Sequence, residues 1–261
     1  MTRRTIGGTI SLVTGASSGI GKAIALELGK QGSNVLLLAR REKHLQSVCD
    51  QILQSGGQAG YIAGDITDPA VRTAALKRIA DNGNRLDILV NNAGRGALGR
   101  FEDADPGRLR GIFETNFFAV AELTREALPL LMRGSNPVIV NVGSILGHRA
   151  TPRNSEYCAS KFALRGWTES IRAELAKSGI DVLMVSPGTT ETEFFQSAEN
   201  PNEKVPWPEQ RGVSAAYVAQ ATLAAIRAGK REIIPNSRGR ILIWANRLFP
   251  GLVDRWMRRY G

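Results

Sequence analysis

The chain has 261 residues, of which 43% are hydrophobic and 22% charged, the profile of a soluble globular protein near the upper size for one core. Its two cysteines, Cys49 and Cys158, form no CxxC pair and have no histidines at metal-ligand spacing, so we predict no disulfide framework, no metal site and a reducing, cytoplasmic compartment. The formal net charge of +10 suggests nucleic acid or an anionic membrane surface as a partner. The sequence has no long apolar run, which argues against a signal peptide and a membrane-spanning helix.

Apolar, β-branched runs bounded by turn residues predict buried parallel strands at 9–14, 34–39, 60–63, 86–90, 137–142, 181–185 and 232–235. Helical patterns separate these runs, at 21–31, 41–55, 69–82, 108–133, 155–178 and 214–228. The alternation predicts one α/β domain, a doubly wound parallel sheet of about seven strands with helices on both faces. We assign 1–236 to this domain and 237–261 to a basic, amphipathic extension of it. The proline-containing segment 189–212 fits neither period and is predicted to be a loop or lid over a site.

The first predicted strand runs into a glycine-rich turn that opens a helix, and ligands of such sheets bind beyond the carboxyl ends of the strands. The candidate cofactor-binding residues of this turn are Gly15, Ser17, Ser18, Gly19, Ile20 and Gly21. Such a turn lets backbone N–H groups and the helix N-terminus approach a pyrophosphate. A tight turn without a ligand is the alternative, and the position directly after the first strand argues against it.

Arg40 and Arg41 follow the second strand, where NAD-binding folds place an acid for the ribose 2′-hydroxyl. Because an arginine can make a bidentate contact with a 2′-phosphate, this position favours NADP over NAD. The alternative is that these are ordinary solvated arginines, and this alternative has more weight for Arg41 than for Arg40. After the third strand, Asp65 is suited to accept a hydrogen bond from an adenine amino group, with Ile66 packing on the ring. Helix capping competes with that role, and we expect it of Asp68, which precedes a proline.

The fourth strand ends in two asparagines, Asn91 and Asn92, which are followed by Ala93 and Gly94. Side-chain amides at this place either brace the central strands or line the cofactor cleft, and the residues alone leave both roles open. We therefore take Asn92, Ala93 and Gly94 as candidate cofactor-binding residues.

The candidate catalytic residues begin with Ser144, which follows the fifth strand and puts a hydroxyl at the mouth of the sheet. Tyr157 and Lys161 come next, and their i, i+4 spacing stacks the phenol and the ammonium on one helical face. The positive charge is expected to lower the tyrosine pKa. Ser144 and Tyr157 can both donate to one carbonyl oxygen, the polarisation that hydride addition needs. Asn116 joins them as a candidate because asparagine is mildly unfavourable inside a helix.

Together these residues resemble the short-chain dehydrogenase/reductase family, which has a Rossmann-type fold, over nearly the whole length from 10 to 235. The motifs TGASSGIG, NNAG and YCASK, with Asn116 and Ser144, stand in the family's order and spacing. The resemblance implies that Tyr157 is the general acid or base, that Ser144 orients the substrate oxygen, and that Asn116 positions a water in a proton relay. It also implies that Lys161 holds the nicotinamide ribose, so that Tyr157 and Lys161 lie at the cofactor as well.

A further element of the resemblance is the segment that closes on the nicotinamide, here Pro187, Gly188, Thr189 and Thr192. The sequence leaves open which threonine makes the contact, because the two residues between Thr189 and Thr192 do not follow the family's usual pattern. The stretches 144–147, 157–161 and 163–166 look like a branch whose members reduce lipophilic carbonyls such as retinoids and steroids. Family members assemble as dimers or tetramers through two long helices, which implies a homo-oligomer through 108–133 and 155–178.

The tail beyond 235 mixes large apolar residues with arginines, a composition that suits a helix lying in a membrane interface. We favour the alternative, an extension that packs over its own substrate pocket or a neighbouring subunit with its arginines in water. The resulting prediction is an NADP(H)-dependent oxidoreductase that reduces a lipophilic ketone or aldehyde. The alternatives are a catalytically silent NADP-binding regulator and a membrane-surface-associated reductase of lipids, retinoids or steroids. Nucleic-acid binding is disfavoured because the tail lacks a recognised motif or interleaved aromatic platforms.

Overall fold

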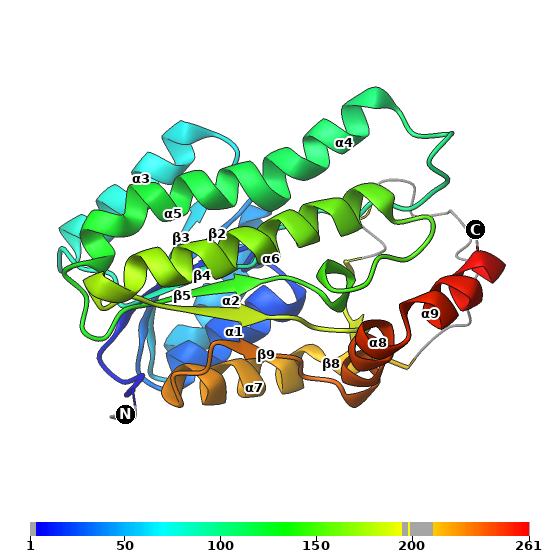
Figure 1. Ribbon diagram of the computed structural model, residues 1–261. Coiled ribbons are helices and arrows are strands. Elements are labelled where there is room, and N and C mark those ends of the chain that lie inside the picture. Colours follow the sequence, from blue (N-terminus) through cyan, green and yellow to red (C-terminus); the bar gives the residue numbers. More distant parts are fainter. Residues whose placement is uncertain (1–3, 195–197, 199–210, 261) are drawn as a thin grey trace.

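The computed structural model describes residues 4–194, 198 and 211–260. In this part of the chain, seven parallel strands form one sheet in the order β3-β2-β1-β4-β5-β6-β9 (Figure 1). The strands are β1 (Ile10–Thr14), β2 (Asn34–Ala39), β3 (Gln58–Ala63), β4 (Ile88–Asn91), β5 (Val138–Val142), β6 (Asp181–Val185) and β9 (Glu232–Ile233). The predicted doubly wound α/β fold is therefore confirmed. The strand order reverses between β1 and β4, which places the expected ligand crevice beyond the carboxyl ends of these two strands.

Two layers of helices cover the sheet, one on each face (Figure 1). The first consists of α1 (Gly19–Lys30), α2 (Glu42–Gln54) and α7 (Ala215–Arg227), and the second of α3 (Pro69–Asp81), α5 (Ala119–Leu131) and α6 (Ser155–Leu175). Successive strand residues point to opposite faces, so Val13 packs with the first layer and Leu12 with the second. This is why both faces of β1 are apolar and why its sequence reads as a continuous apolar run.

The long helix predicted over 108–133 is interrupted. It comprises α4 (Pro106–Phe113), a π-helical turn (Glu114–Phe118) and α5. Asp105 caps the start of α4 by accepting a hydrogen bond from the Gly107 amide. The π turn carries Asn116, and such turns are frequent at functional sites because they shift a side chain out of the regular helical register.

Only part of the predicted lid 189–212 falls within the described residues. There, β7 (Thr190–Glu191) pairs in parallel with β8 (Val213–Ser214), so this segment is tied to the start of α7. Pro201, Pro206 and Pro208, on which the loop prediction rested, lie outside the described residues.

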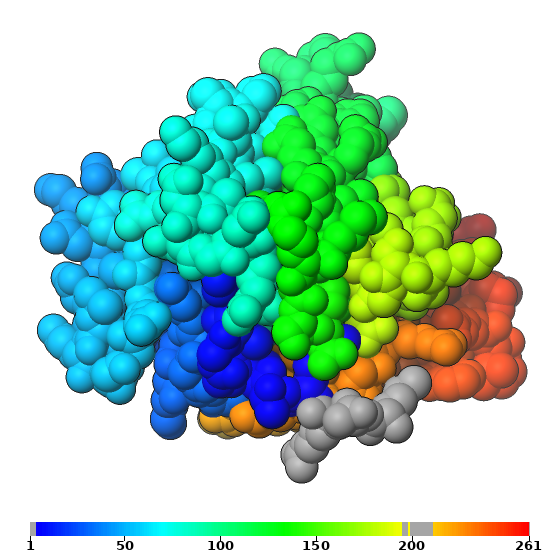
Figure 2. Space-filling view, turned by 90° about the vertical axis from the view of Figure 1, so that its left-hand side faces the viewer, coloured from blue at the N-terminus to red at the C-terminus, as the bar shows by residue number. Residues whose placement is uncertain are grey.

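The tail forms two helices, α8 (Ser237–Leu248) and α9 (Pro250–Met257), at the end of the molecule opposite the N-terminus (Figure 1). Viewed from the side of the N-terminus, the surface colours run from blue and cyan through green to yellow, orange and red, as the strand order requires (Figure 2). Among the described residues, no helix is both long and apolar enough to cross a membrane.

Candidate functional site

A cavity of about 1060 Å³ lies at the carboxyl ends of the strands. It is lined by all the candidate site residues except Gly21 and Asn116, and by four tail residues: Leu242, Trp256, Met257 and Tyr260. The glycine turn, the Arg40–Arg41 corner and the Ser144–Tyr157–Lys161 group therefore share one hollow. Its volume is at the upper end of the range for small-molecule sites, as a dinucleotide together with a substrate would require.

The glycine turn brings backbone close to backbone at the switch point. Gly15 and Gly19 have φ values of 65° and 54°, which L side chains rarely adopt. A Cβ on Gly15 would lie 2.9 Å from the Cα of Ala93, and one on Gly21 would collide with the Asn92 amide and the Gly15 carbonyl. Ser18, the N-cap of α1, makes no side-chain capping bond, so its hydroxyl is not used by the helix.

Thr14, which the sequence analysis did not single out, holds this turn to the end of β4. Its Oγ1 accepts hydrogen bonds from the amides of Asn92 and Ala93, both at 3.0 Å, and donates to the Val90 carbonyl. The Asn92 side chain donates in turn to the Thr14 and Gly15 carbonyls at 3.0 and 3.2 Å. Asn92 thus braces the turn as well as lining the cavity. The signal for Thr14 was a hydroxyl at a buried strand end directly before the glycines.

Asn91 serves the other role that the sequence left open, which is to brace the central strands. Its amide donates to Asn141 Oδ1 at 2.8 Å and to Thr124 Oγ1 at 2.9 Å. Asn141 continues the chain of bonds to Thr168 on α6. This buried network of hydrogen bonds joins β4, β5, α5 and α6.

Arg40 and Arg41 both line the cavity but differ in their partners. The Arg40 side chain is 64% exposed, and its Nη1 lies 3.9 Å from Asp65 Oδ2. Arg41 donates to Ser17 Oγ at 3.3 Å and to Glu193 Oε2 at 3.1 Å. Its side chain is 42% exposed, so Arg41 joins the glycine turn to the segment after β7 while it stays in contact with water.

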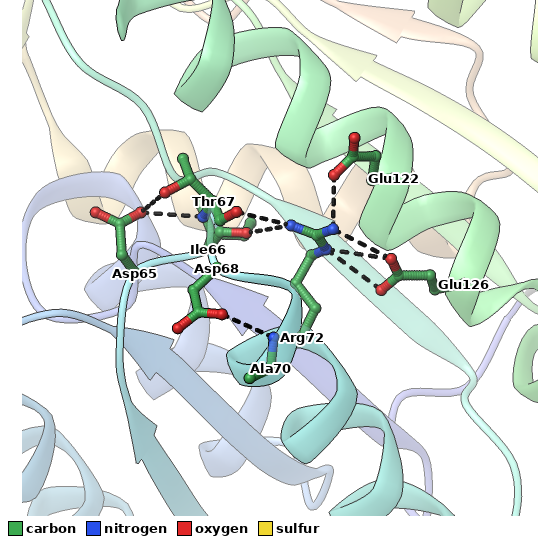
Figure 3. Close-up of polar contacts among 8 residues, drawn as sticks. All are labelled: Asp65, Ile66, Thr67, Asp68, Ala70, Arg72, Glu122 and Glu126. Atoms are coloured by element: carbon green, nitrogen blue, oxygen red, sulfur yellow. Dashed lines mark hydrogen bonds and ion pairs between the residues drawn. The ribbon is translucent and has the colours of Figure 1, made fainter.

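The loop after β3 is shaped by two acids and a buried arginine (Figure 3). Asp68 caps α3 by accepting from the Ala70 amide, as expected, whereas Asp65 accepts from the amide and hydroxyl of Thr67. Arg72, which the sequence analysis missed, is only 3% exposed. It donates to the Ile66 carbonyl at 3.0 Å and to the Thr67 carbonyl at 3.2 Å, and its charge is matched by glutamates 122 and 126 on α5. These contacts fix the place of Asp65 at the cavity wall.

Tyr157, in the first turn of α6, is 7% exposed and hydrogen-bonds with Ser144. Burial raises the pKa of the Tyr157 phenol above its ordinary value, and the bond with Ser144 opposes this only in part. Lys161 Nζ donates to the Val142 carbonyl at 3.0 Å and lies 5.7 Å from the centroid of the Tyr157 ring. Burial lowers the pKa of Lys161 to about 8. The expected lowering of the tyrosine pKa is therefore wrong, because loss of hydration on burial has a larger effect than the bond with Ser144 that opposes it.

Asn116 lies beneath the cavity floor and is 1% exposed. Its Nδ2 donates to the Arg95 carbonyl and to Ser160 Oγ, both at 3.0 Å, and its Oδ1 accepts from the Arg95 amide. A Cβ on Gly94 would lie 3.2 Å from Asn116 Oδ1 and 3.8 Å from Lys161 Nζ, so the three residues meet at one point. The π turn thus brings the Asn116 amide near the ammonium.

The segment after β6 closes one side of the cavity. The Pro187 carbonyl accepts from the Ile145 amide at 2.9 Å, while Thr190 turns back to donate to the Gly188 carbonyl. Thr192 is the threonine that packs on the glycine turn, since a Cβ on Gly19 would lie 3.2 Å from its Cγ2. Phe194, which the sequence analysis did not single out, lies 5.6 Å from the Tyr157 ring, centroid to centroid.

The tail packs over the cavity of its own chain, one of the arrangements that the sequence left open. Leu242, Trp256, Met257 and Tyr260 line it. Arg149 anchors the tail by donating to Asn246 on α8 at 3.1 Å and pairing with Asp254 on α9 at 2.7 Å. The tail therefore contributes apolar wall to the site.

Comparisons with known proteins agree with this geometry. A family described as short chain dehydrogenase matches residues 9–203. The chain is 32% identical to the ketoacyl reductase HetN of Nostoc sp., over 98% of this chain and 91% of that protein. It is similar in structure to a short chain dehydrogenase/reductase from Burkholderia phymatum in complex with NAD (TM-score 0.86, 21% identity, 95% of this chain and 96% of the other). It is also similar to an alcohol dehydrogenase from Thermococcus sibiricus complexed with 5-hydroxy-NADP (TM-score 0.77, 23% identity, 87% and 95%).

Proposed function

Since the chain belongs to the short-chain dehydrogenase/reductase family of oxidoreductases, we propose that it is an NADP(H)-dependent enzyme that reduces a lipophilic ketone or aldehyde. The observation that carries this proposal is the meeting of Ser144, Tyr157 and Lys161 in one cavity with a glycine turn and two arginines. A hydroxyl pair beside a buried ammonium can polarise and protonate a carbonyl oxygen, which is the part of a reduction that a protein must supply.

The cavity fits a nicotinamide dinucleotide on its own features. Gly15 and Gly21 let the glycine turn pack closely on Asn92 and Ala93, where a Cβ would collide, and this turn leaves the amides at the start of α1 free to hold the diphosphate. Arg40 and Arg41 would hold the 2′-phosphate, with Asp65 at the adenine. The residues that would contact the pyrophosphate and the nicotinamide are Asn92, Ala93, Gly94, Pro187, Gly188, Thr189 and Thr192. When bound, the nicotinamide supplies the hydride or accepts it.

The chain's own residues would manage the substrate oxygen. As the substrate carbon gains a hydride, the electron pair of the C=O π bond moves to oxygen, and Tyr157 Oη gives that oxygen its proton. Ser144 Oγ donates a second hydrogen bond, which favours the charge that develops on oxygen. The raised pKa keeps Tyr157 protonated near neutrality, which suits the acid role. Lys161 would hold the nicotinamide ribose and, with Asn116 and a water, return a proton to the phenolate.

The preference for an apolar substrate rests on the cavity wall. The apolar side chains that line the same cavity as the reacting groups are Leu98, Leu146, Phe194, Leu242, Trp256 and Met257. A polar or charged substrate would lose its hydration against these side chains without a matching partner. This supports ketones and aldehydes on apolar frames.

We extend the proposal to a homodimer or homotetramer formed through α5 and α6. Phe118, at the end of the π turn that leads into α5, and Phe162, on α6, remain 47% and 43% exposed, and burial in a partner would remove that apolar surface from water. Sedimentation velocity of the wild type and of Phe162→Ser tests this. A monomer at micromolar concentration contradicts it.

The decisive experiment follows NADPH consumption with a panel of retinoids, steroids, aliphatic aldehydes, ketones and acyl thioesters. The Tyr157→Phe variant removes the proton donor with little change of volume, and we expect at least a hundredfold lower kcat with NADPH binding retained. Tyr61→Phe, on β3 and away from the cavity, is the matched control and should keep full activity. A wild type that binds NADPH but turns over none of the panel would refute catalysis and leave the silent NADP-binding regulator.

A further inference from the structure

Helices α8 and α9 carry an apolar surface that nothing in the described chain covers. Ile241, Trp244 and Leu248 recur at i, i+3 and i+7 on α8, which aligns them along one side of that helix. Phe249, Leu252 and Trp256 continue the surface across the corner and along α9. All six side chains are between 44% and 68% exposed. We call these six residues the outer apolar face.

This face is not needed to hold the tail in place. The inward sides of the two helices are filled by Ile243, Val253 and Met257, each at most 7% exposed. Arg149 adds polar anchors to both helices on the same inward side. A second set of large apolar side chains on the outward side adds nothing to this packing, and exposed patches of this kind mark interaction sites.

The charges around the face have one sign. The exposed arginines of the tail are Arg238, Arg240, Arg247, Arg255, Arg258 and Arg259. The acid of the tail, Asp254, is taken up by Arg149 from the body of the protein. Among the described residues, none of the six arginines pairs with a carboxylate, and Arg247 lies over the Trp244 ring at 5.7 Å.

We propose that the outer apolar face docks on an anionic lipid surface. Large apolar side chains that protrude from a short helix pair, with arginines beside them, can enter the acyl boundary while the guanidinium groups meet lipid phosphates. Tryptophan is favoured at that depth, and arginine stems reach up to the headgroups from buried positions. The arrangement therefore matches both layers of a membrane interface.

A second copy of this chain fits the face less well. A two-fold contact through the outer apolar face would bring six uncompensated arginines on one copy against six on the other, and like charges in such a contact are unfavourable. A nucleic acid would satisfy the arginines but leave the aliphatic side chains Ile241, Leu248 and Leu252 without an apolar partner. A lipid surface has anionic headgroups outside and an apolar interior, so it can satisfy both the arginines and the exposed apolar side chains.

The docked face adjoins the cavity, because Trp256 belongs to both. A lipophilic substrate could then pass between bilayer and cavity without crossing water, a consequence that rests on the proposed function. The docking itself does not depend on catalysis. Tyr157→Phe is accordingly expected to bind membranes as the wild type does.

The test is co-sedimentation of the full chain with phosphatidylcholine vesicles, with and without phosphatidylserine. We expect binding to the phosphatidylserine vesicles, weakened by added salt, and little binding to phosphatidylcholine alone. Each of two variants, Trp244→Ser/Leu248→Ser and Arg255→Gln/Arg258→Gln/Arg259→Gln, should weaken binding at least roughly tenfold. NADPH affinity without vesicles should stay unchanged, which shows that the variants are folded.

Matched controls remove equal numbers of exposed apolar or basic side chains elsewhere. Leu53→Ser/Met132→Ser deletes two exposed apolar side chains, and Lys30→Gln/Lys43→Gln/Lys77→Gln deletes three exposed charges from α1, α2 and α3. Both should bind vesicles as the wild type does. The proposal is overturned if the wild type does not bind vesicles, or if the tail variants bind them as well as the wild type does. The proposal is also overturned if the wild type binds no vesicles but forms an oligomer that the Trp244→Ser/Leu248→Ser variant does not form. The outer apolar face would then be the contact with a second copy of the chain.

Discussion

Arg108 on α4 and Glu156 on α6 form a buried ion pair one residue before Tyr157. Arg108 Nε and Nη2 donate to Glu156 Oε1 at 2.9 and 2.6 Å, and the two side chains are 4% and 7% exposed. Arg108 also donates to the carbonyl of Leu98, which lines the cavity. The pair therefore fixes the first turn of α6, and with it the phenol, against α4 and the loop after β4.

Breaking this pair on one side should destabilise the protein strongly. Arg108→Leu leaves a buried carboxylate without its partner, and we expect a loss of about 3–5 kcal/mol in the free energy of unfolding. The double variant Arg108→Leu/Glu156→Leu should recover most of that loss, because no charge is left buried. Urea denaturation of the wild type, the single variants Arg108→Leu and Glu156→Leu, and the double variant gives the coupling energy. A single variant as stable as the wild type would show that Glu156 is hydrated.

The same pair predicts a pH dependence. Burial tends to raise the pKa of Glu156, but the hydrogen bonds from Arg108 and Ser155 outweigh it, so the pKa lies below the ordinary value of 4.5. A carboxyl with a lowered folded-state pKa stabilises the protein above its unfolded pKa, and this stability is lost as pH falls through the folded pKa. The wild type should thus lose stability relative to the double variant below about pH 4.5. Parallel denaturation curves from pH 3 to 7 (roughly the range of carboxyl titration) measure it.

The sequence predicted β2 and β6 with their observed bounds, because a parallel strand buried on both faces is a continuous apolar run ended by turn residues. It could not show the π turn at Asn116, since one extra residue per turn barely alters the apolar spacing over five residues. Arg72 and Arg108 escaped notice for another reason. Charged residues on a helix are normally solvated, and only the distant glutamates that fold against these two reveal that they are buried.

The tail shows a different limit. Its apolar and basic residues suggested either packing or a membrane interface, as if the two were exclusive. In the structure, Leu242 and Ile243 face inward while Ile241 and Trp244 face outward on the same helix. Apolar residues on both sides give a weak helical pattern, so the sequence could not separate the two faces. The position of each residue relative to the cavity was needed for that.

Lys161 is predicted to lower the stability of the protein at neutral pH. Its folded-state pKa is about 8 rather than 10.5, so the folded chain binds fewer protons than the unfolded chain between these values, and stability rises with pH across that window. The shift corresponds to at most about 3 kcal/mol below pH 8, from which roughly 1 kcal/mol for the lost bond to Val142 must be subtracted. Lys161→Met should therefore be more stable than the wild type at pH 7, by about 1–2 kcal/mol, yet inactive.

The control for this prediction is the pH trend itself. The advantage of Lys161→Met should shrink as the pH rises from 8 towards 10.5, because the folded wild type loses the ammonium near pH 8 and the unfolded chain loses it only near pH 10.5. Lys22→Met, on α1, should show no such trend. A constant difference at every pH would mean that Lys161 is hydrated in the folded protein.

Two glycine substitutions should act in opposite directions. Gly21→Ala places a methyl group against the Asn92 amide and the Gly15 carbonyl, and we expect a loss of about 1–3 kcal/mol in stability together with weaker NADPH binding. Gly166→Ala, in α6, meets nothing within 4 Å and should instead raise stability by up to about 1 kcal/mol, because alanine favours the helix. Thermal unfolding and NADPH titration of both variants decide this. Unchanged cofactor binding in Gly21→Ala would contradict the assignment of the turn to the diphosphate.

Arg40 should decide between the two nicotinamide cofactors. It reaches the cavity with its guanidinium largely exposed, so it can turn to a 2′-phosphate, and each charged hydrogen bond to that group is worth about 1.5–3 kcal/mol. Arg40→Leu should raise the NADPH dissociation constant by roughly 10- to 100-fold and leave that of NADH nearly unchanged. Lys43→Leu, which removes an exposed charge from α2, controls for general electrostatics.

Arg41 should behave differently, because it already bonds to Ser17 and Glu193. Its replacement by leucine releases the segment after β7 from the glycine turn, so we expect weaker binding of both cofactors, with the larger loss for NADPH. Intrinsic tryptophan fluorescence during titration gives the dissociation constants of NADH and NADPH for each protein. Equal losses of NADH and NADPH in Arg40→Leu would remove the physical basis for NADP preference, since only the 2′-phosphate distinguishes the two ligands at this corner of the cavity.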